Sequence, residues 1–194
     1  RSGRGSVHQR MTERLYADRT IAAYRLQARR AIANWSRGRR PSPFLKQFVS
    51  TLPAHARVLD YGCGIGREMS WMRAQGLRVD GVDATLEFVL EARRRCPGVP
   101  VRHARFEGVA LEPQAYDGIW CNASLIHVPP LELKRQLDKL REALRPGGTL
   151  GLILAWGRYR GFTKRDWIPG RYLAGYRRDE GIRFLRGWDL LRVK

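Results

Sequence analysis

The stretch that decides the fold is Val58-Leu-Asp-Tyr-Gly-Cys-Gly-Ile-Gly66, in which a short apolar run opens into a turn with glycine at every second position. The run predicts a buried β-strand, because a short apolar segment bounded by turn residues is typical of strands covered on both faces. Gly62 and Gly64 let the backbone turn sharply and approach a ligand where a side chain would collide. Asp60, two residues before Gly62, places a carboxylate beside this turn.

A second acid follows at the end of the next predicted strand. Asp83 lies seventeen residues after Gly66, and an acid at this place accepts hydrogen bonds from the hydroxyls of a ribose. The turn and the acid together predict a nucleoside-containing cofactor across the carboxyl ends of the strands. A nicotinamide dinucleotide fits less well, because Arg67 stands where its fingerprint needs a third glycine. Asp60 would also repel a pyrophosphate, whereas it complements an ammonium group.

From Pro53 onward the pattern alternates between strands and helices, which is typical of a parallel sheet covered by helices on both faces. The predicted strands cover residues 57–61, 77–82, 99–103, 116–121, 149–155 and 188–193. The predicted helices cover residues 16–35, 43–51, 67–74, 86–95, 133–144 and 179–185. The sequence therefore predicts a doubly wound, mostly parallel α/β fold with a helical N-terminal extension.

The charge is strongly basic and unevenly distributed. The 194 residues carry a formal net charge of +19, and nearly half of it comes from residues 1–40, which hold eleven arginines against Glu13 and Asp18. Such an excess favours a nucleic-acid partner, but a solvated basic surface explains it as well. We expect residues 1–15 to be a disordered basic extension. Residues 16–194 are expected to form a single domain, because the chain is too short for two.

Other classes of protein are excluded by what the sequence lacks. No apolar stretch approaches the length of a membrane-spanning helix, and the basic start has no signal-peptide run, so we expect a cytoplasmic protein without a membrane partner. Cys63, Cys96 and Cys121 have no metal-like spacing. We therefore expect free thiols, without a disulfide or a metal site.

These residues resemble the class I S-adenosylmethionine-dependent methyltransferases, in particular small bacterial enzymes of the methyltransferase-domain type. The resemblance runs from about Tyr16 to Val193. It is carried by four segments in order: VLDYGCGIGR at 58–67, VDGVDAT at 79–85, YDGIWCNASLIHVPP at 116–130 and LREALRPGGTL at 140–150. It implies a Rossmann-like fold with S-adenosylmethionine as the cofactor. The family sheet usually includes an antiparallel seventh strand. Here that strand either lies beyond this sequence, is absent or is supplied by a partner, and an open sheet edge would favour a homodimer.

The resemblance also implies which residues bind the cofactor. They are Tyr24, Asp60, Tyr61, Gly62, Cys63, Gly64, Arg67, Asp83, Ala84, Phe106, Asn122 and Ala123. In this interpretation Asp60, Gly62 and Gly64 line the methionine part, Asp83 holds the ribose, and Ala84 lies beside the adenosine.

The remaining positions surround the other parts of the cofactor. The resemblance places Phe106 against the adenine, at a position where many members carry an acid. Tyr24 and Arg67 are candidates for the cofactor carboxylate, with core packing and a solvated helix start as their alternatives. Asn122 and Ala123 border the methyl-transfer site.

The implied reaction is in-line transfer of a methyl group to a small-molecule acceptor. Positioning and desolvation carry much of such a reaction, so a base is not always needed. If the acceptor is a hydroxyl, His127 is the candidate catalytic base; packing of its loop is the alternative. Residues 156–162 either bind an anionic or planar acceptor or cover the sheet edge. An RNA methyltransferase and a non-catalytic cofactor-binding protein remain alternative functions.

Overall fold

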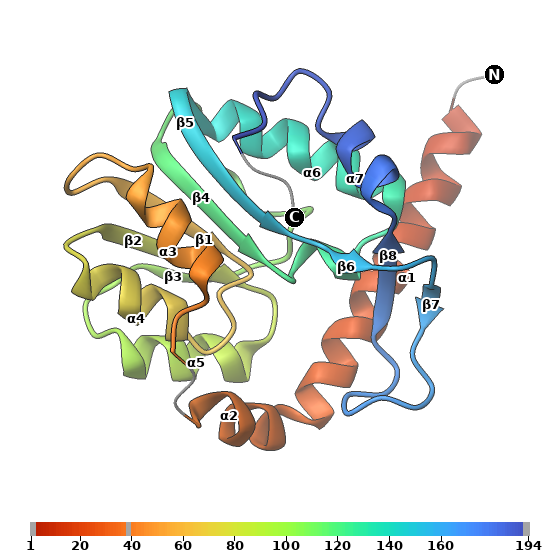
Figure 1. The fold of residues 1–194 in the computed structure, drawn as a ribbon. Helices are drawn as coiled ribbons and strands as arrows, with labels where there is room; N and C mark the ends of the chain where they lie inside the picture. Colours follow the sequence, from red (N-terminus) through yellow and green to blue (C-terminus); the bar gives the residue numbers. More distant parts are fainter. Residues whose placement is uncertain (1–2, 38–39, 192–194) are drawn as a thin grey trace.

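The computed structural model describes residues 3–37 and 40–191, and a five-stranded parallel sheet forms its centre (Figure 1). The strands lie in the order β3-β2-β1-β4-β5. Their bounds are β1 Arg57–Tyr61, β2 Arg78–Asp83, β3 Val101–His103, β4 Tyr116–Asn122 and β5 Leu144–Ile153. The order reverses between β1 and β4, so the loops that follow these two strands diverge and leave room for a ligand at the carboxyl edge. The predicted α/β fold is confirmed.

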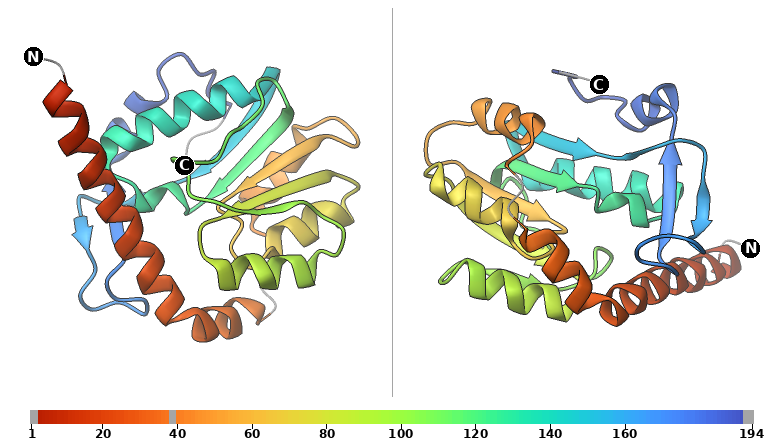
Figure 2. Two further views of the ribbon diagram at one scale, coloured as in Figure 1. Left: turned by 180° about the vertical axis from the view of Figure 1, so that it is seen from behind. Right: turned by 60° about the horizontal axis from the view of Figure 1, so that its bottom comes forward.

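Helices cover both faces of the sheet (Figures 1 and 2). One face packs against α3 Pro43–Ser50, α4 Arg67–Ala74 and α5 Leu86–Arg95, and the other against α6 Pro130–Ala143. Ser42 caps the start of α3, since its Oγ accepts a hydrogen bond from the Leu45 amide at 3.1 Å. The short helix α7 Arg178–Phe184 lies near the end of the chain.

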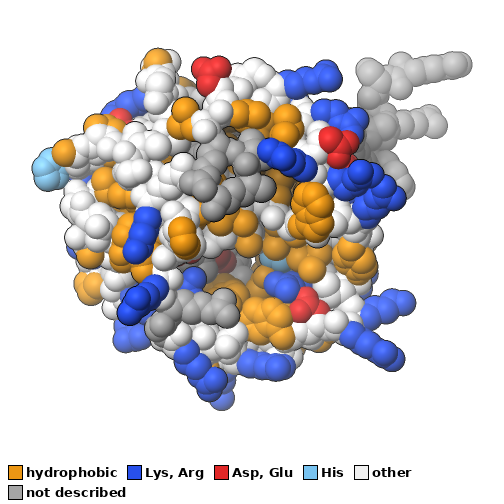
Figure 3. Space-filling model, viewed as in Figure 1, with side chains coloured by type: hydrophobic (Ala, Val, Ile, Leu, Met, Phe, Trp, Pro, Cys, Tyr) orange, Lys and Arg blue, Asp and Glu red, His pale blue; other side chains and the backbone are white. Residues whose placement is uncertain are grey.

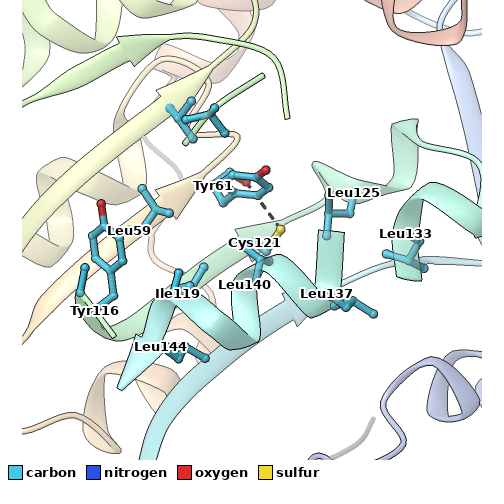
Figure 4. Close-up of a cluster of buried hydrophobic side chains, with 14 of the residues drawn as sticks. Leu59, Tyr61, Tyr116, Ile119, Cys121, Leu125, Leu133, Leu137, Leu140 and Leu144 are labelled. Carbon is cyan, nitrogen blue, oxygen red and sulfur yellow. Dashed lines mark hydrogen bonds between the residues drawn. The ribbon is translucent and has the colours of Figure 1, made fainter. Parts of the chain in front are cut away.

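The core beneath α6 shows the pattern that positions these elements (Figure 4). Ile119 and Cys121 of β4 face α6, while Trp120 between them is buried on the opposite face, as strand alternation requires. Leu137 and Leu140 meet this row from the helix. Each such leucine contributes roughly 1.5–3 kcal/mol through burial, so the face that each residue presents is strongly fixed.

The N-terminal segment forms two helices instead of the single predicted helix over residues 16–35. Helix α1 runs from Gly3 to Leu26 and α2 from Ala28 to Ser36, with a break at Gln27. Residues 3–15, which we expected to be disordered, are helical; residues 6–26 contain neither glycine nor proline to end the helix. Helix α1 runs past β8 and α2 lies near α5 (Figure 2).

A second sheet was not predicted. It contains β6 Ala155–Trp156, β7 Arg160–Phe162 and β8 Tyr172–Tyr176, in the order β6-β8-β7. The predicted strand over residues 188–193 is wrong at residues 188–191, where Trp188 instead packs on the guanidinium of Arg141; residues 192–194 lie outside the described part.

The outer edge of β5 is open. Within residues 3–37 and 40–191, β5 pairs only with β4. A groove of about 960 Å³ runs along this edge, lined by β5, α3, α7 and the last described residues.

The turn after β1 depends on the absence of a side chain at Gly62. A Cβ atom there would overlap the Cβ of Ser124, and the residue has φ +88°. Gly76 has a similar φ of +83° with no atom within 4 Å of its Cβ position. Both alanine variants should incur the left-handed backbone cost of about 1–2 kcal/mol, and Gly62→Ala should lose a further 1–3 kcal/mol or so from overlap. Urea unfolding measures the loss of stability in each variant. Equal losses for Gly62→Ala and Gly76→Ala would contradict the close contact of Gly62 with Ser124.

Candidate active site

The carboxylate that ends β2 is bound to the glycine turn. Asp83 accepts a hydrogen bond from the Gly64 amide through Oδ2 at 2.9 Å and one from the Thr85 amide through Oδ1 at 2.8 Å. Burial raises the pKa of the Asp83 carboxyl, and these two amide donors oppose that rise. The predicted acid and the predicted turn therefore meet at the carboxyl edge of the sheet, with Ala84 directly after the acid.

The space over the turn is bordered by the N-terminal helices. A Cβ atom on Gly64 would meet only the Trp35 ring of α2, at 3.7 Å. Trp35 in turn contacts Phe88 and Trp167, with ring centroids 5.1 and 5.6 Å away. Figure 3 shows a recess near the centre of this face of the molecule, with an acidic side chain and a histidine at depth and hydrophobic side chains around them.

Asp60 presents an unused acceptor beneath the turn. Its side chain is 2% exposed, and its Oδ2 has no hydrogen-bond partner among the described residues. Burial raises the pKa of Asp60 well above its ordinary value, and the carboxylates of Glu68 and Asp83 raise it further, while Arg67 lowers it. A buried carboxylate oxygen without a partner is costly. A cationic group on a ligand would remove this cost, so the site fits the ammonium of an aminoacyl group.

Tyr24 and His127, 103 residues apart, are in direct contact. The Tyr24 hydroxyl lies 2.8 Å from the His127 Nε2, and the His127 Nδ1 lies 2.8 Å from the Tyr172 carbonyl oxygen. Because a carbonyl only accepts, Nδ1 carries the proton, and Tyr24 therefore donates to Nε2. Arg171 donates to the Tyr24 oxygen at 2.8 Å and binds the Asp166 carboxylate at 3.0 and 2.7 Å.

Burial sets the protonation state of the histidine. Burial lowers the pKa of His127 from its ordinary value of 6.5 to about 4, and Arg171 lowers it too. The ring is therefore neutral at neutral pH, with both nitrogens bound inside the protein. This geometry favours the packing role over that of a free base. Arg171 and Asp166 were not predicted, because no local motif marks them.

Two of the expected cofactor-binding residues have side chains in the core. Tyr61 is fully buried, stacks on Phe106 with ring centroids 4.4 Å apart, and donates to the Gln136 Oε1 at 2.6 Å. The Cys63 side chain lies against Gly81 of β2, and burial raises the pKa of this thiol well above its ordinary value. Both residues can line the turn only through their backbone.

Residues at the end of β4 lie on the same edge of the sheet. Asn122 donates from Nδ2 to the Glu68 Oε1 at 2.8 Å, and Arg67 lies beside Glu68, with its Nη2 3.7 Å from the same oxygen. Ala123 follows Asn122 with φ +52°, a left-handed conformation that costs an alanine about 1–2 kcal/mol. Its amide donates to the Ile153 carbonyl oxygen at 3.1 Å, which holds the turn in place.

A parallel sheet with this order, a glycine turn after β1 and an acid ending β2 defines a Rossmann-like protein that binds a nucleoside cofactor. Residues 58–148 match the family described as methyltransferase domain. The match and the fold together identify this segment as a methyltransferase domain with the class I, Rossmann-like fold.

Similar proteins share this domain. The chain is 33% identical over 104 residues to malonyl-[acyl-carrier protein] O-methyltransferase from Enterobacter lignolyticus, covering 53% of this chain and 41% of the relative. It is 36% identical over 104 residues to trans-aconitate 2-methyltransferase from Paracidovorax citrulli, covering 52% and 39%. The chain thus spans less than half the length of these curated relatives.

The fold extends beyond the segment matched in sequence. A crystal structure of Burkholderia thailandensis 1,6-didemethyltoxoflavin-N1-methyltransferase, with bound 1,6-didemethyltoxoflavin and S-adenosylhomocysteine, has a TM-score of 0.65 at 20% identity. It covers 90% of this chain and 78% of the other. Among the described residues, no helix combines the length and apolar character needed to cross a membrane.

The buried histidine predicts a specific dependence of stability on pH. Its pKa of about 4 in the folded protein lies below the ordinary 6.5, so the unfolded chain takes up a proton first as pH falls. The free energy of unfolding should therefore drop between pH 6.5 and 4, by about 3 kcal/mol. In His127→Gln, which keeps a donor and an acceptor, this part of the drop should vanish. The free energy of unfolding is measured by urea at several pH values. An equal drop between pH 6.5 and 4 in the wild type and in His127→Gln would refute the assignment.

Proposed function

We propose that the chain transfers the methyl group of S-adenosylmethionine to a small-molecule acceptor. The observation that carries this proposal is the buried, unpartnered Oδ2 of Asp60 beside the glycine turn, within the electrostatic reach of Asp83. The Asp60 Oδ2 fits the ammonium of the methionine moiety, and the Asp83 carboxylate fits the ribose hydroxyls. The bound cofactor supplies an electrophilic methyl group on a sulfonium, open to in-line displacement.

The residues of this chain bind and orient that cofactor. Asp60 would hold the ammonium through a charge-assisted hydrogen bond, and Asp83 would share its carboxylate between the Gly64 amide and the ribose. Arg67, which lies at the first turn of α4, is the donor we propose for the cofactor carboxylate. The Tyr24 hydroxyl, whose proton is donated to His127 Nε2, would border that carboxylate without donating to it. Phe106, stacked on Tyr61 next to the turn, would border the adenine.

The state of His127 bears on the acceptor. A histidine with a pKa of about 4 and an occupied Nε2 is a weak base for a hydroxyl. We infer that the attacking atom needs no deprotonation at neutral pH, as holds for a carboxylate oxygen. The two relatives described above are named for malonyl and trans-aconitate groups, both of which bear carboxylates. In this proposal His127 positions Tyr24 instead of taking a proton.

Two other functions make different predictions. An RNA methyltransferase, suggested by the arginines of residues 1–40, would bind RNA with an affinity that falls steeply with salt. A non-catalytic protein would bind the cofactor without turning it over.

A homodimer formed along the open edge of β5 would be seen in the molecular mass in solution and is independent of the chemistry.

Calorimetric titration with S-adenosylhomocysteine tests the binding site. Wild-type protein should bind, and Asp83→Ala should weaken binding by about 1–3 kcal/mol, because it loses charged hydrogen bonds. Asp138→Ala is the control, since Asp138 is a half-exposed residue paired with Lys134 on α6. Absence of binding to the wild type would refute the proposal, and an unchanged Asp83→Ala would remove Asp83 from the site.

Turnover with a panel of acceptors tests the reaction. With S-adenosylmethionine present, small dicarboxylates should yield methyl esters, while phenols and alcohols should react far more slowly. Reaction of phenols alone, with a rate that rises with pH, would contradict the inferred acceptor. Binding without turnover of any acceptor would favour the non-catalytic alternative.

A further inference from the structure

A carboxylate in the first turn of α4 links the glycine turn to β4. Glu68 accepts a hydrogen bond from the Trp120 Nε1 through Oε2 at 2.6 Å and one from the Asn122 Nδ2 through Oε1 at 2.8 Å. Its side chain is 15% exposed. Trp120 and Asn122 are two residues apart on β4 and therefore project from the same face of the sheet. Neither the sequence motifs nor the comparisons assign a role to Glu68.

Glu68 determines which way the Asn122 amide points. An ionised carboxylate only accepts hydrogen bonds, whereas an asparagine amide has one donating end and one accepting end. With both Glu68 oxygens bound to donors, Asn122 must turn its Nδ2 toward Glu68 and its Oδ1 away. Among the residues that the structure describes, none donates a hydrogen bond to the Asn122 Oδ1, so this acceptor is available at the end of β4.

The same carboxylate adds to the negative charge around Asp60. Asp60 lies two residues before the glycine turn and has an unpartnered Oδ2, and the Glu68 carboxylate is the largest charged influence on it. Asp83 acts in the same direction and Arg67 against it. The groups that surround this spot are therefore mainly hydrogen-bond acceptors and negative charges, which suit a cation.

We propose that Glu68 is a positioning residue that selects nucleoside ligands carrying a free ammonium group. It orients the Asn122 oxygen and, together with Asp60, supplies the negative charge that meets the ammonium. This inference rests on the proposed function, because the ammonium belongs to the aminoacyl part of the cofactor. Ligands with the same nucleoside but no aminoacyl group lack the ammonium, so their binding does not depend on Glu68.

A proton is linked to the binding of that cation. The pKa of Asp60 is raised by burial, by Glu68 and by Asp83, and is lowered by Arg67. An ammonium bound at Asp60 stabilises the ionised carboxylate, so binding releases a proton and the affinity rises with pH up to the pKa of Asp60 in the free protein. Removing the Glu68 charge lowers that pKa, and the affinity should level off at a lower pH.

The test compares two ligands that differ in the aminoacyl group. Dissociation constants for S-adenosylhomocysteine and for 5′-methylthioadenosine are measured for the wild type and for Glu68→Gln. A glutamine offers one acceptor oxygen, so it cannot serve both Trp120 and Asn122, and the Asn122 amide turns over. We expect the first ligand to bind about tenfold more weakly, the scale of one charged hydrogen bond, and the second ligand to be unchanged.

Glu91→Gln is the matched control, because the Glu91 side chain is 11% exposed and is also bound by two partners, Arg94 and Arg95. It should leave both constants unchanged. Glu68→Asp retains the charge and should recover part of the lost affinity. If Glu68→Gln does not fold, Asn122→Ala removes the accepting oxygen and should weaken S-adenosylhomocysteine alone.

The outcomes separate this inference from the function on which it rests. Equal losses for both ligands would show a merely structural role and overturn the inference, as would unchanged binding of S-adenosylhomocysteine. A plateau that stays at the same pH in Glu68→Gln would overturn the link to Asp60. Failure of the wild type to bind S-adenosylhomocysteine would instead overturn the proposed function.

Discussion

The site depends on one close contact between the turn after β1 and the turn after β4. The Ser124 hydroxyl donates to the Tyr61 carbonyl at 2.6 Å, and its Cβ occupies the space that a side chain on Gly62 would need. This contact sets the distance between the glycine turn and Asn122 at the end of β4. Asp83 fixes the other side of the turn through the Gly64 amide. The shape of the glycine turn therefore depends on contacts to its backbone and not on exposed side chains.

The parts of the fold that the sequence predicted are those with a local pattern. Helices α4 and α5 have the predicted bounds, because apolar spacing, the glycine turn and Cys96-Pro97-Gly98 mark their ends. The second sheet has no such pattern, since β6 and β7 are only two and three residues long. The contact of Arg171 with Tyr24 joins residues 147 positions apart, which no periodicity reveals.

The candidate site was predicted better for backbone than for side chains. The sequence located the turn, Asp60 and Asp83, but strand alternation sends the Tyr61 side chain to the core face opposite Asp60, where it stacks on Phe106. Glu68 was overlooked because an acid in the first turn of a helix is ordinary, being favoured by the helix dipole. Only the placement of β4 beside α4 shows that this acid faces a tryptophan and an asparagine.

The strained turn at Ala123 affects which substitutions would make this protein more stable. An alanine at φ +52° lowers the stability of the protein, because only glycine adopts this backbone conformation without strain. A glycine here would relieve the strain but would also give the turn after β4 many more conformations. Variants selected only for heat resistance would therefore tend to accumulate changes at this bend, at the expense of a rigid turn after β4.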